Sequence, residues 1–235
     1  MTLQNMIDDS RRIVFFGGAG VSTESGIPDF RSADGLYNQK YAYPPEQIVS
    51  HSFFMRRTEE FYRFYRDRMI FPDAKPNAAH LKLAELERAG KLSCVITQNI
   101  DGLHQAAGSR NVIELHGSVH RNHCMSCGKK YPLSAVTEST GIPRCSCGGV
   151  IKPDVVLYEE SLDDGDLTRA MTEISEADMM MIGGTSLAVY PAAGLVRFFR
   201  GRHLAVINKS AISADSTAEL VIADAIGKVM SEIRC

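Results

Sequence analysis

Short, almost wholly apolar runs recur along the chain between longer stretches with helical spacing, and this alternation limits the fold more than any other feature. Because each run is apolar at nearly every position, the corresponding strand should be buried on both faces, as in a parallel sheet covered by helices. The runs span residues 13–16, 94–97, 112–115, 155–158, 179–182, 204–207 and 220–223. The clearest helix is 77–92, where Asn77 can cap the first turn and Gly90 can end the last. The pattern predicts an α/β fold with a doubly wound parallel sheet.

Two stretches interrupt this rhythm. Residues 32–75 are rich in aromatic and basic side chains and include "EEFYRFYRDRMIF", which is typical of an amphipathic helix. Residues 120–150 contain clustered cysteines with glycine and proline turns. We interpret both as insertions that form a smaller lobe beside the sheet. The predicted large domain is therefore 1–31, 76–119 and 151–235, and the predicted small domain is 32–75 with 120–150.

Composition narrows the possible partners and location. At 235 residues and 44% hydrophobic, the chain can bury a sizeable core. A net charge of -2 gives no global electrostatic case for binding nucleic acid or an anionic membrane. The N-terminus lacks the pattern of a secretory signal, and no apolar run approaches the ~18–20 residues of a membrane span. We expect a cytoplasmic protein with no direct nucleic-acid or membrane partner.

Four of the six cysteines lie in one short region. They are Cys124 and Cys127 of "CMSC", and Cys145 and Cys147 of "CSC". In a reducing compartment, such a cluster favours a metal site over disulfides, and a tetrahedral structural zinc needs four such ligands. His120 or His123 could replace one thiolate, and free or redox-active thiols are the alternative. We predict a structural zinc held by the four cysteines.

A glycine-rich turn, "GGAGVS", follows the first apolar run directly. Gly17, Gly18 and Gly20 would let the backbone approach a pyrophosphate, and a following helix N-terminus would present free N–H groups to it. The acidic residue that holds the ribose in dehydrogenases, about 20 residues further on, is not evident. "GIPDFRS" comes next, where Phe30 could cover a ring and Arg31 could bind phosphate or a carboxylate. A surface turn with a buried phenylalanine is the alternative.

Polar side chains follow two further apolar runs. Gln98, Asn99 and Asp101 of "TQNIDGLHQAAGS" come directly after a strand, at the sheet edge where open α/β proteins bind ligands. They could fix an amide and a ribose by hydrogen bonds. His116 of "ELHGS" follows the next strand. A packed core histidine is one possibility, but this position favours a general base, because imidazole titrates near working pH.

Together these motifs resemble the sirtuin family of NAD-dependent protein-lysine deacylases over nearly the whole chain. The matching stretches are "GAGVSTESGIPDFRS", "TQNIDGLHQAAG", "ELHGS", the cysteine cluster, "KPDVVLYEE", "GTSLAVYPAA" and "VINK". The resemblance implies a Rossmann-like large domain, a small domain of zinc module plus helices, and a cleft between them for NAD and acyl-lysine. It also implies that NAD is consumed: nicotinamide leaves, and the acyl group passes to ADP-ribose.

The resemblance also implies roles for individual residues. His116 would be the general base that activates a ribose hydroxyl. The residues expected to bind NAD are Gly18, Ala19, Gly20, Thr23 and Arg31, with Phe30, Ile100 and Asp101 around the nicotinamide, Gln98, Asn99 and His116 at the ribose, and Gly184, Thr185, Ser186, Asn208, Lys209 and Ile226 on the adenosine side. Segment 152–160 would pair with the substrate peptide, with Val155 and Val156 beside the acyl-lysine tunnel and Tyr158 as a further substrate contact.

The chain departs from the family pattern at three places. The second cysteine pair is CxC instead of CxxC, and Tyr158-Glu159-Glu160 replaces the common Phe-Gly-Glu. Where the acidic-acyl branch has Tyr-x-x-Arg, this chain has Tyr62 and Tyr65, with Arg66 one place late. That difference favours an apolar acyl pocket and therefore acetyl-lysine. We predict NAD-dependent deacetylation of proteins or peptides, and separately we expect a monomer. The alternatives are a protein ADP-ribosyltransferase and a non-catalytic, NAD-sensing zinc-ribbon module.

Overall fold

The computed structural model describes residues 1–30, 35 and 42–235, and its centre is a six-stranded parallel sheet. The strand order is β3-β2-β1-β7-β8-β9, so successive strands run outward from β1 in one direction and then from β7 in the other. The strands are β1 (Ile13–Gly17), β2 (Leu92–Thr97), β3 (Val112–Glu114), β7 (Met179–Gly183), β8 (His203–Ile207) and β9 (Leu220–Ile222). The predicted doubly wound sheet is confirmed, and its order reverses between β1 and β7.

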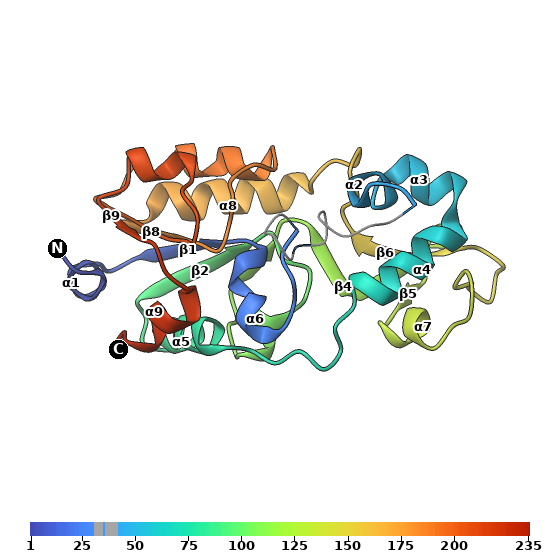
Figure 1. Cartoon of the computed structure of the whole chain (residues 1–235), viewed down its shortest axis with the longest axis horizontal. Coiled ribbons are helices and arrows are strands. Elements are labelled where there is room, and N and C mark those ends of the chain that lie inside the picture. The colour runs from blue at the N-terminus through green and yellow to red at the C-terminus, as the bar shows by residue number, and fades with distance from the viewer. Residues whose placement is uncertain (31–34, 36–41) are drawn as a thin grey trace.

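Helices cover both faces of this sheet (Figure 1). Alternate residues of β1 point to opposite sides: Ile13 and Phe15 pack in one apolar cluster, and Val14 and Phe16 in the other. The first cluster contains residues of α1 (Leu3–Asp9), α5 (Ala78–Arg88) and α9 (Ile226–Ser231). The second contains residues of α8 (Asp164–Glu176) and of the 3-10 helix η4 (Ala192–Phe198). Every residue of β1 is buried, which is why its sequence is apolar without alternation.

Helix α5 shows how the local sequence sets its ends. The Asn77 side chain accepts a hydrogen bond from the backbone N–H of Ala79 at 3.0 Å, which caps the first turn as expected. The last turn ends at Arg88, four residues before the predicted end, and Gly90 then adopts a left-handed φ of 73°. That turn reverses the chain into β2, which begins at Leu92.

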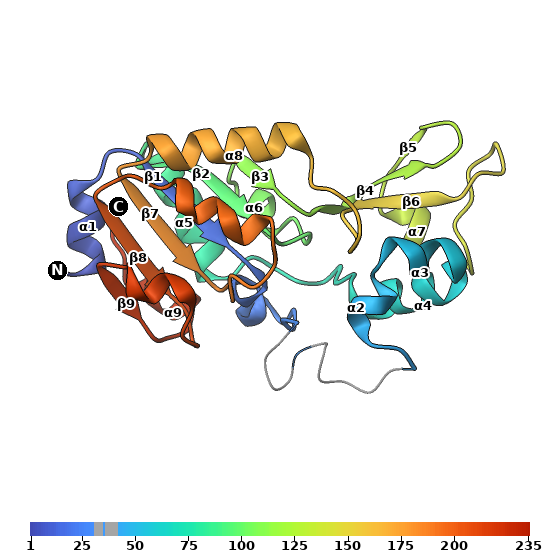
Figure 2. The same ribbon diagram turned by 90° about the horizontal axis from the view of Figure 1, so that it is seen from above.

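A second lobe lies beside the large sheet and contains a three-stranded antiparallel sheet of order β5-β4-β6 (Figure 2). Its elements are α2 (Pro45–Ile48), α3 (His51–Arg56), α4 (Thr58–Arg68), β4 (Gly117–Cys124), β5 (Lys130–Tyr131), α7 (Ser134–Thr137) and β6 (Ile151–Val155). The predicted strand at 155–158 is therefore wrong in position and in sheet. Its apolarity has another cause, because Val155 and Leu157 pack against Phe54 and Phe61 in the core of the small lobe.

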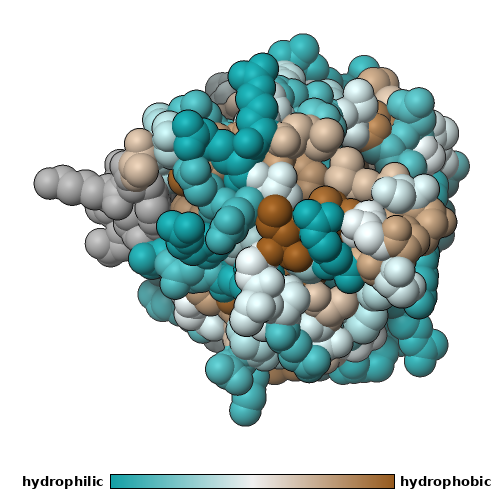
Figure 3. Space-filling view, turned by 90° about the vertical axis from the view of Figure 1, so that its right-hand side faces the viewer, coloured by the Kyte–Doolittle hydropathy of each residue, from teal (hydrophilic) through white to brown (hydrophobic). Residues whose placement is uncertain are grey.

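Aromatic side chains form the core of this lobe. Phe61 stacks on Tyr65 at 5.4 Å between ring centroids and meets Phe54 edge-on at 4.9 Å. The predicted amphipathic helix is thus α4, whose buried face carries these rings. Figure 3 views the molecule from this end, where hydrophobic residues are interspersed among hydrophilic ones. Across the residues that the structure describes, no helix is both long and apolar enough to cross a membrane.

Candidate active site

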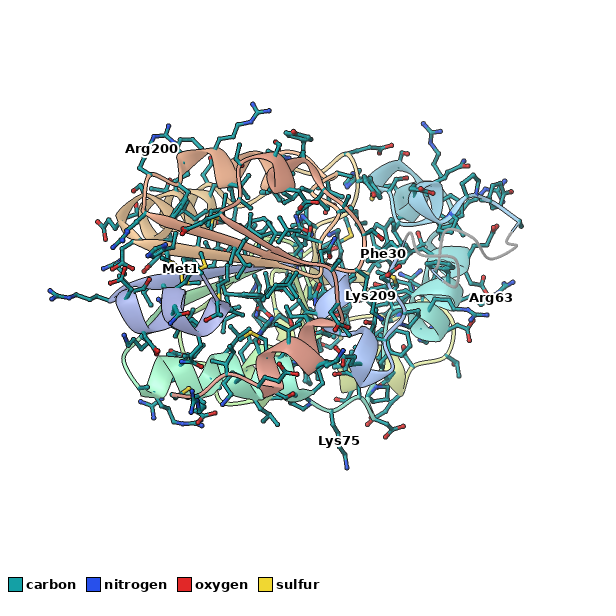
Figure 4. The ribbon with its side chains drawn as sticks, turned by 60° about the vertical axis from the view of Figure 1, so that its left-hand side comes forward. Met1, Phe30, Arg63, Lys75, Arg200 and Lys209 are labelled. Atoms are coloured by element: carbon teal, nitrogen blue, oxygen red, sulfur yellow. The ribbon has the colours of Figure 1, made fainter. Side chains whose placement is uncertain are left out.

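A cavity of about 1140 Å³ lies between the two lobes, at the carboxyl ends of the parallel strands. Its walls come from the loops after β1, β2, β3, β7 and β8, from the end of α4, and from the segment after β6. Figure 4 labels Phe30 and Lys209, which both line the cavity at the junction of the lobes. The position agrees with the rule that open α/β sheets bind ligands where the strand order reverses.

The glycine-rich turn packs tightly against the loop after β7. The Gly20 N–H donates to the Gly184 carbonyl at 2.8 Å, and a Cβ on Gly20 would lie 2.8 Å from the Gly184 Cα. Side chains are therefore excluded here by a second loop. The expected helix N-terminus is wrong: the described residues between Gly17 and Pro45 form only two 3-10 turns, Ala19–Val21 and Thr23–Ser25. Residues of both turns, among them Ala19, Gly20 and Thr23, line the cavity.

His116 lies in the tight connection between β3 and β4 and lines the cavity. Its Nδ1 lies 2.9 Å from the Gln98 carbonyl oxygen, which can only accept, so Nδ1 carries the proton in the neutral ring. Burial lowers the pKa of His116, against a smaller opposing effect of this hydrogen bond. The imidazole is therefore neutral at pH 7, and Nε2 is the atom that can take up a proton.

A hydrogen-bonded network joins the loop after β2 to the glycine-rich turn. The Asn99 Nδ2 donates to Ser22 Oγ at 3.0 Å, and Ser22 Oγ donates to Asp101 Oδ2 at 2.6 Å. The Leu103 N–H donates to the other carboxylate oxygen of Asp101. Ser22 was not selected from the sequence as a site residue, although it stands in the same motif as the glycines. The network fixes Asn99 and Asp101 at the cavity wall.

Most of the residues predicted to bind NAD or substrate share this one cavity. Those that line it are Ala19, Gly20, Thr23, Phe30, Gln98, Asn99, Ile100, Asp101, His116, Gly184, Thr185, Ser186, Asn208, Lys209, Ile226, Val155, Val156 and Tyr158. Gly18 lies behind the wall, where a Cβ would meet Gln98 and Thr185 at 2.9 Å. Arg31 lies outside the described residues. The individual roles of these residues stay predictions.

The segment after β6 is tied to the small lobe by its backbone. The Tyr158 N–H donates to the Val49 carbonyl at 3.0 Å, and the His51 N–H donates to the Tyr158 carbonyl at 2.9 Å. Glu159 then adopts a φ of 75°, in the left-handed region that favours glycine. Its carboxylate accepts from the Ser52 N–H at 2.8 Å and from the Ser52 hydroxyl at 2.9 Å, at the first turn of α3.

Glu160 anchors the same segment from the other side. Its Oε2 accepts from the Leu157 N–H at 2.9 Å and from the Lys152 ammonium at 3.0 Å. Its Oε1 lies 2.9 Å from His51 Nδ1. The partners together hold the pKa of Glu160 below its usual value, although burial alone would raise it. With Tyr158-Glu159-Glu160 in place of Phe-Gly-Glu, the segment is thus held by the carboxylates of Glu159 and Glu160.

The inner wall of the cavity at α4 carries Tyr65. Arg66, the next residue, points elsewhere: its guanidinium donates to the carbonyls of Val136 and Gly141 and to the Ser139 hydroxyl, at 2.7–2.8 Å. Arg66 therefore does not line the cavity, although it is adjacent to Tyr65 in the sequence. Arg68 also lines the cavity, and it forms an ion pair with Asp67.

Two buried histidines, which sequence reasoning missed, lie side by side in the large lobe, and neither lines the cavity. The His80 and His104 rings are 4.7 Å apart between centroids, and both side chains are enclosed. Burial lowers the pKa of His80 to about 4 and that of His104 to about 3. Both rings are therefore neutral at pH 7. They come from α5 and α6 (Leu103–Ala106), so only the packing of these helices brings them together.

The four predicted cysteines meet in the small lobe. Their sulfur atoms all lie within 4.8 Å of one another, with 3.5 Å between Cys124 and Cys147 and 3.6 Å between Cys127 and Cys145. This donor set fits a tetrahedral zinc. The close turn needed by the CxC pair uses glycine, because a Cβ on Gly149 would lie 2.7 Å from Cys124 Sγ. The residues 120–150 thus contain a candidate metal centre with four thiol ligands.

The candidate metal centre has its own hydrogen-bond donors. The Tyr131 hydroxyl donates to Cys145 Sγ at 3.0 Å. A backbone N–H at Cys147 and this hydroxyl lower the pKa of Cys145 to about 5, which favours the thiolate that a metal requires. The histidines considered as substitutes bond elsewhere: His120 Nε2 contacts the Asp101 carbonyl oxygen at 3.0 Å, and His123 Nδ1 contacts the Asp154 carboxylate.

The fold, the cavity and the cysteine cluster together define a Sir2-type protein, and the Sir2 family model matches residues 18–191. The chain belongs to the Sir2 family. It is similar to the NAD-dependent protein deacetylase of Clostridium acetobutylicum, with 60% identity covering 98% of this chain and 96% of that protein. The corresponding protein of Cutibacterium acnes is 58% identical, over 99% of this chain and 96% of its own length.

Solved Sir2 structures have the same fold. A Sir2 homologue–NAD complex matches with a TM-score of 0.88 and 41% identity, over 98% of this chain and 90% of that one. A Sir2 protein with p53 peptide and NAD+ matches with a TM-score of 0.85 and 40% identity, over 98% and 96%.

Proposed function

We propose that this protein removes acetyl groups from protein lysines with NAD as a consumed cosubstrate. Family membership supports the proposal, as does the similarity over nearly the whole chain to proteins named NAD-dependent protein deacetylases. The observation that carries it is His116, a half-buried neutral imidazole whose Nδ1–H is held by the Gln98 carbonyl. A base in that state, in a cavity walled by polar amide and carboxylate groups, suits activation of a sugar hydroxyl.

The proposed reaction is an acyl transfer. The bond between nicotinamide and ribose breaks, the acetyl oxygen bonds to the exposed ribose carbon, and His116 Nε2 takes a proton from a ribose hydroxyl. The acetyl group then moves to the ribose, which yields O-acetyl-ADP-ribose and free lysine after water is added. Asn99 and Asp101, held through Ser22, would position the groups around the bond that breaks.

The proposed binding roles divide the cavity into regions. Phe30, Ile100 and Asp101 would surround the nicotinamide. The glycine-rich turn with Ala19, Thr23 and Arg31 would bind the phosphates, and Thr185, Ser186, Asn208, Lys209 and Ile226 the adenosine. Val155, Val156 and Tyr158 would contact the acetyl-lysine peptide, whose backbone would add to the 152–160 segment. The four cysteines would hold a zinc ion with all positions filled by protein, which gives it a structural role.

The domain division at 31/32, 75/76, 119/120 and 150/151 is part of the proposal. The small sheet reaches past two of these boundaries, because β4 begins at Gly117 and β6 runs from Ile151 to Val155, both within the predicted large domain, and the two strands pair with each other. We further propose that the protein is cytoplasmic, because a reducing compartment keeps four closely spaced thiols available for a metal. We also propose that it is a monomer.

Mass spectrometry of one acetylated peptide incubated with the protein and NAD tests the proposal. Loss of acetyl with release of nicotinamide and O-acetyl-ADP-ribose is the expected result, and a reaction without NAD is the control. ADP-ribose attached to protein would instead support the transferase alternative. An absence of NAD turnover would support the non-catalytic alternative and refute the proposed activity.

A further inference from the structure

Strand β4 leaves its ladder with β6 for three residues beside the cavity. Ser118 pairs with Asp154 of β6. The next paired residue of β4 is Asn122, which lies opposite Pro153, the direct neighbour of Asp154. Residues 119–121, all of them in the described part of the chain, therefore have no partner on β6 and form a bulge. Bulges beside a site commonly re-aim side chains, so the contacts of this one indicate what it does.

The bulge contacts the loop after β2, which the proposed reaction places around the nicotinamide. The Val119 N–H donates to the Ile100 carbonyl at 3.0 Å. His120 Nε2 lies 3.0 Å from the Asp101 carbonyl oxygen, which can only accept, so Nε2 carries a proton and donates. His120 also lines the cavity. Two successive residues of the small lobe thus hold two successive carbonyls of the large lobe.

The His120 ring also lies against the turn that follows this loop. Gly102 adopts a left-handed φ of 73° there, directly before α6. A Cβ on this glycine would lie 2.8 Å from His120 Cδ2 and 2.9 Å from Nε2, so the ring fills the space where a side chain would stand. The ring therefore prevents the turn from moving toward β4, and the hydrogen bond opposes its moving away.

The large lobe holds the same loop from the opposite side. The Asp101 carboxylate accepts from Ser22 Oγ at 2.6 Å and from the Leu103 N–H at 2.9 Å. The Ile100 side chain packs against the apolar core of the small lobe. Ser22 thus acts on the carboxylate of Asp101 and His120 on its backbone, so both lobes determine where this residue stands in the cavity wall.

We propose that His120 is a positioning residue for the nicotinamide end of NAD. Its hydrogen bond to the Asp101 carbonyl fixes the loop that carries Ile100 and Asp101 across the junction of the lobes. The inference rests on the proposed function, in which these two residues surround the nicotinamide. Because His120 acts through the loop, its loss should weaken the binding of nicotinamide and spare ADP-ribose, which lacks that ring.

Two substitutions separate the hydrogen bond from the ring. His120→Phe keeps a planar ring against Gly102 and removes the donor, whereas His120→Gln keeps an N–H donor at a similar reach and removes the ring. His120 is exposed, so both variants should unfold within a few degrees of the unmodified protein. The two ligands compared are nicotinamide, which the proposed reaction releases, and ADP-ribose, which is the rest of NAD.

His120→Phe should raise the nicotinamide concentration that halves deacetylation by about two- to tenfold, the range expected from one hydrogen bond, and leave the calorimetric Kd for ADP-ribose unchanged. His120→Gln should restore most of the difference. Unchanged inhibition in His120→Phe, an equal weakening of ADP-ribose binding, or a glutamine variant as weak as the phenylalanine variant would overturn the inference.

The proposed function is tested separately by the same proteins. If the unmodified protein deacetylates but the variants give one of those contrary results, the function stands and only the role of His120 is wrong. Failure to turn over any acetylated peptide with NAD would refute the function. The calorimetric Kd for NAD relative to that for ADP-ribose would then decide the role of His120, and a ratio unchanged in His120→Phe would overturn it.

Discussion

Replacing Glu159 by alanine and by glycine separates two opposing contributions at the segment after β6. Glu159 has a left-handed φ of 75°, which costs a non-glycine residue about 1–2 kcal/mol. Its carboxylate accepts two hydrogen bonds from Ser52 at the first turn of α3. An exposed carboxylate in that position contributes about 1–2 kcal/mol through its hydrogen bonds and its place at a helix start.

The two variants should therefore differ from each other. Glu159→Ala loses the hydrogen bonds and keeps the backbone strain, so the free energy of unfolding should fall by about 1–2 kcal/mol. Glu159→Gly loses the same bonds but relieves the strain, partly offset by the greater freedom of glycine in the unfolded chain. We expect Glu159→Gly to be about 1 kcal/mol more stable than Glu159→Ala, or roughly 2–4 °C in unfolding temperature for a chain of this size.

Denaturant and thermal unfolding of the two variants measure this difference, and peptide KM gives a second readout. Both variants lose the link between the Glu159 side chain and Ser52 of α3, next to Tyr158 at the cavity wall, so both should raise the KM for acetylated peptide while the KM for NAD changes little. Equal stability of the two variants would show that the strain is no larger than the roughly 0.5–1 kcal/mol that glycine loses through its freedom in the unfolded chain, and would refute the estimate above. An alanine variant as stable as the unmodified protein would show that the Ser52 hydrogen bonds contribute nothing.

Four other perturbations test the remaining features. His116→Ala should lower deacetylation by ~10²–10⁴-fold with most NAD affinity retained, measured by turnover and by calorimetric titration; near-normal turnover would mean that another base acts. Chelation of the metal, or Cys145→Ala, should lower the unfolding temperature and abolish activity because the small lobe unfolds. A metal analysis that finds no zinc would refute the site. Acetyl-lysine peptide should be preferred over succinyl-lysine peptide by at least about tenfold in kcat/KM, and Tyr65→Arg should narrow the gap; equal rates would mean that a cation such as Arg68 reaches the tunnel. Because the pKa values of His80 and His104 lie below the ordinary 6.5, the unfolded chain binds more protons, and stability falls as pH drops from about 6.5 toward about 4. Urea unfolding should show a loss of at least about 2 kcal/mol between pH 7 and pH 5, and unchanged stability would mean that water or a charge reaches these rings.

The parallel sheet could be predicted because its strands carry their burial in their own sequence. β1 and β7 are buried at every position, so each is an unbroken apolar run that needs no knowledge of its neighbours. The same logic failed at 155–158, where Val155 and Leu157 are apolar because they face the aromatic core of the other lobe. Apolarity reports burial and does not identify which core provides it.

The candidate sites also differ in how far the sequence alone could predict them. The cysteine cluster could be predicted because its ligands are paired in the sequence, and the structure needs only one hairpin-like reversal to bring the pairs together. The His80–His104 contact could not, because it depends on how α5 packs against α6. The sequence offers no reason to select Ser22, because a serine after a glycine-rich turn is common. Only its bonds to Asn99 and Asp101 distinguish it.

Strand β4 begins directly after His116 and ends at Cys124, so one strand of eight residues has the proposed base at one end and a metal ligand at the other. At about 3.3 Å per residue, the eight steps from His116 to Cys124 span up to about 26 Å, too far for the metal to act on the imidazole directly. Local opening offers another connection, because elements that share a ladder tend to open as one cooperative unit. Fraying of β4 from β6 at the cysteine end would reach the register shift between Ser118 and Asn122, beyond which Gly117 pairs with Val155 beside the cavity. Amide protons along this strand would then report, residue by residue, how far an event at the metal centre reaches toward the chemistry.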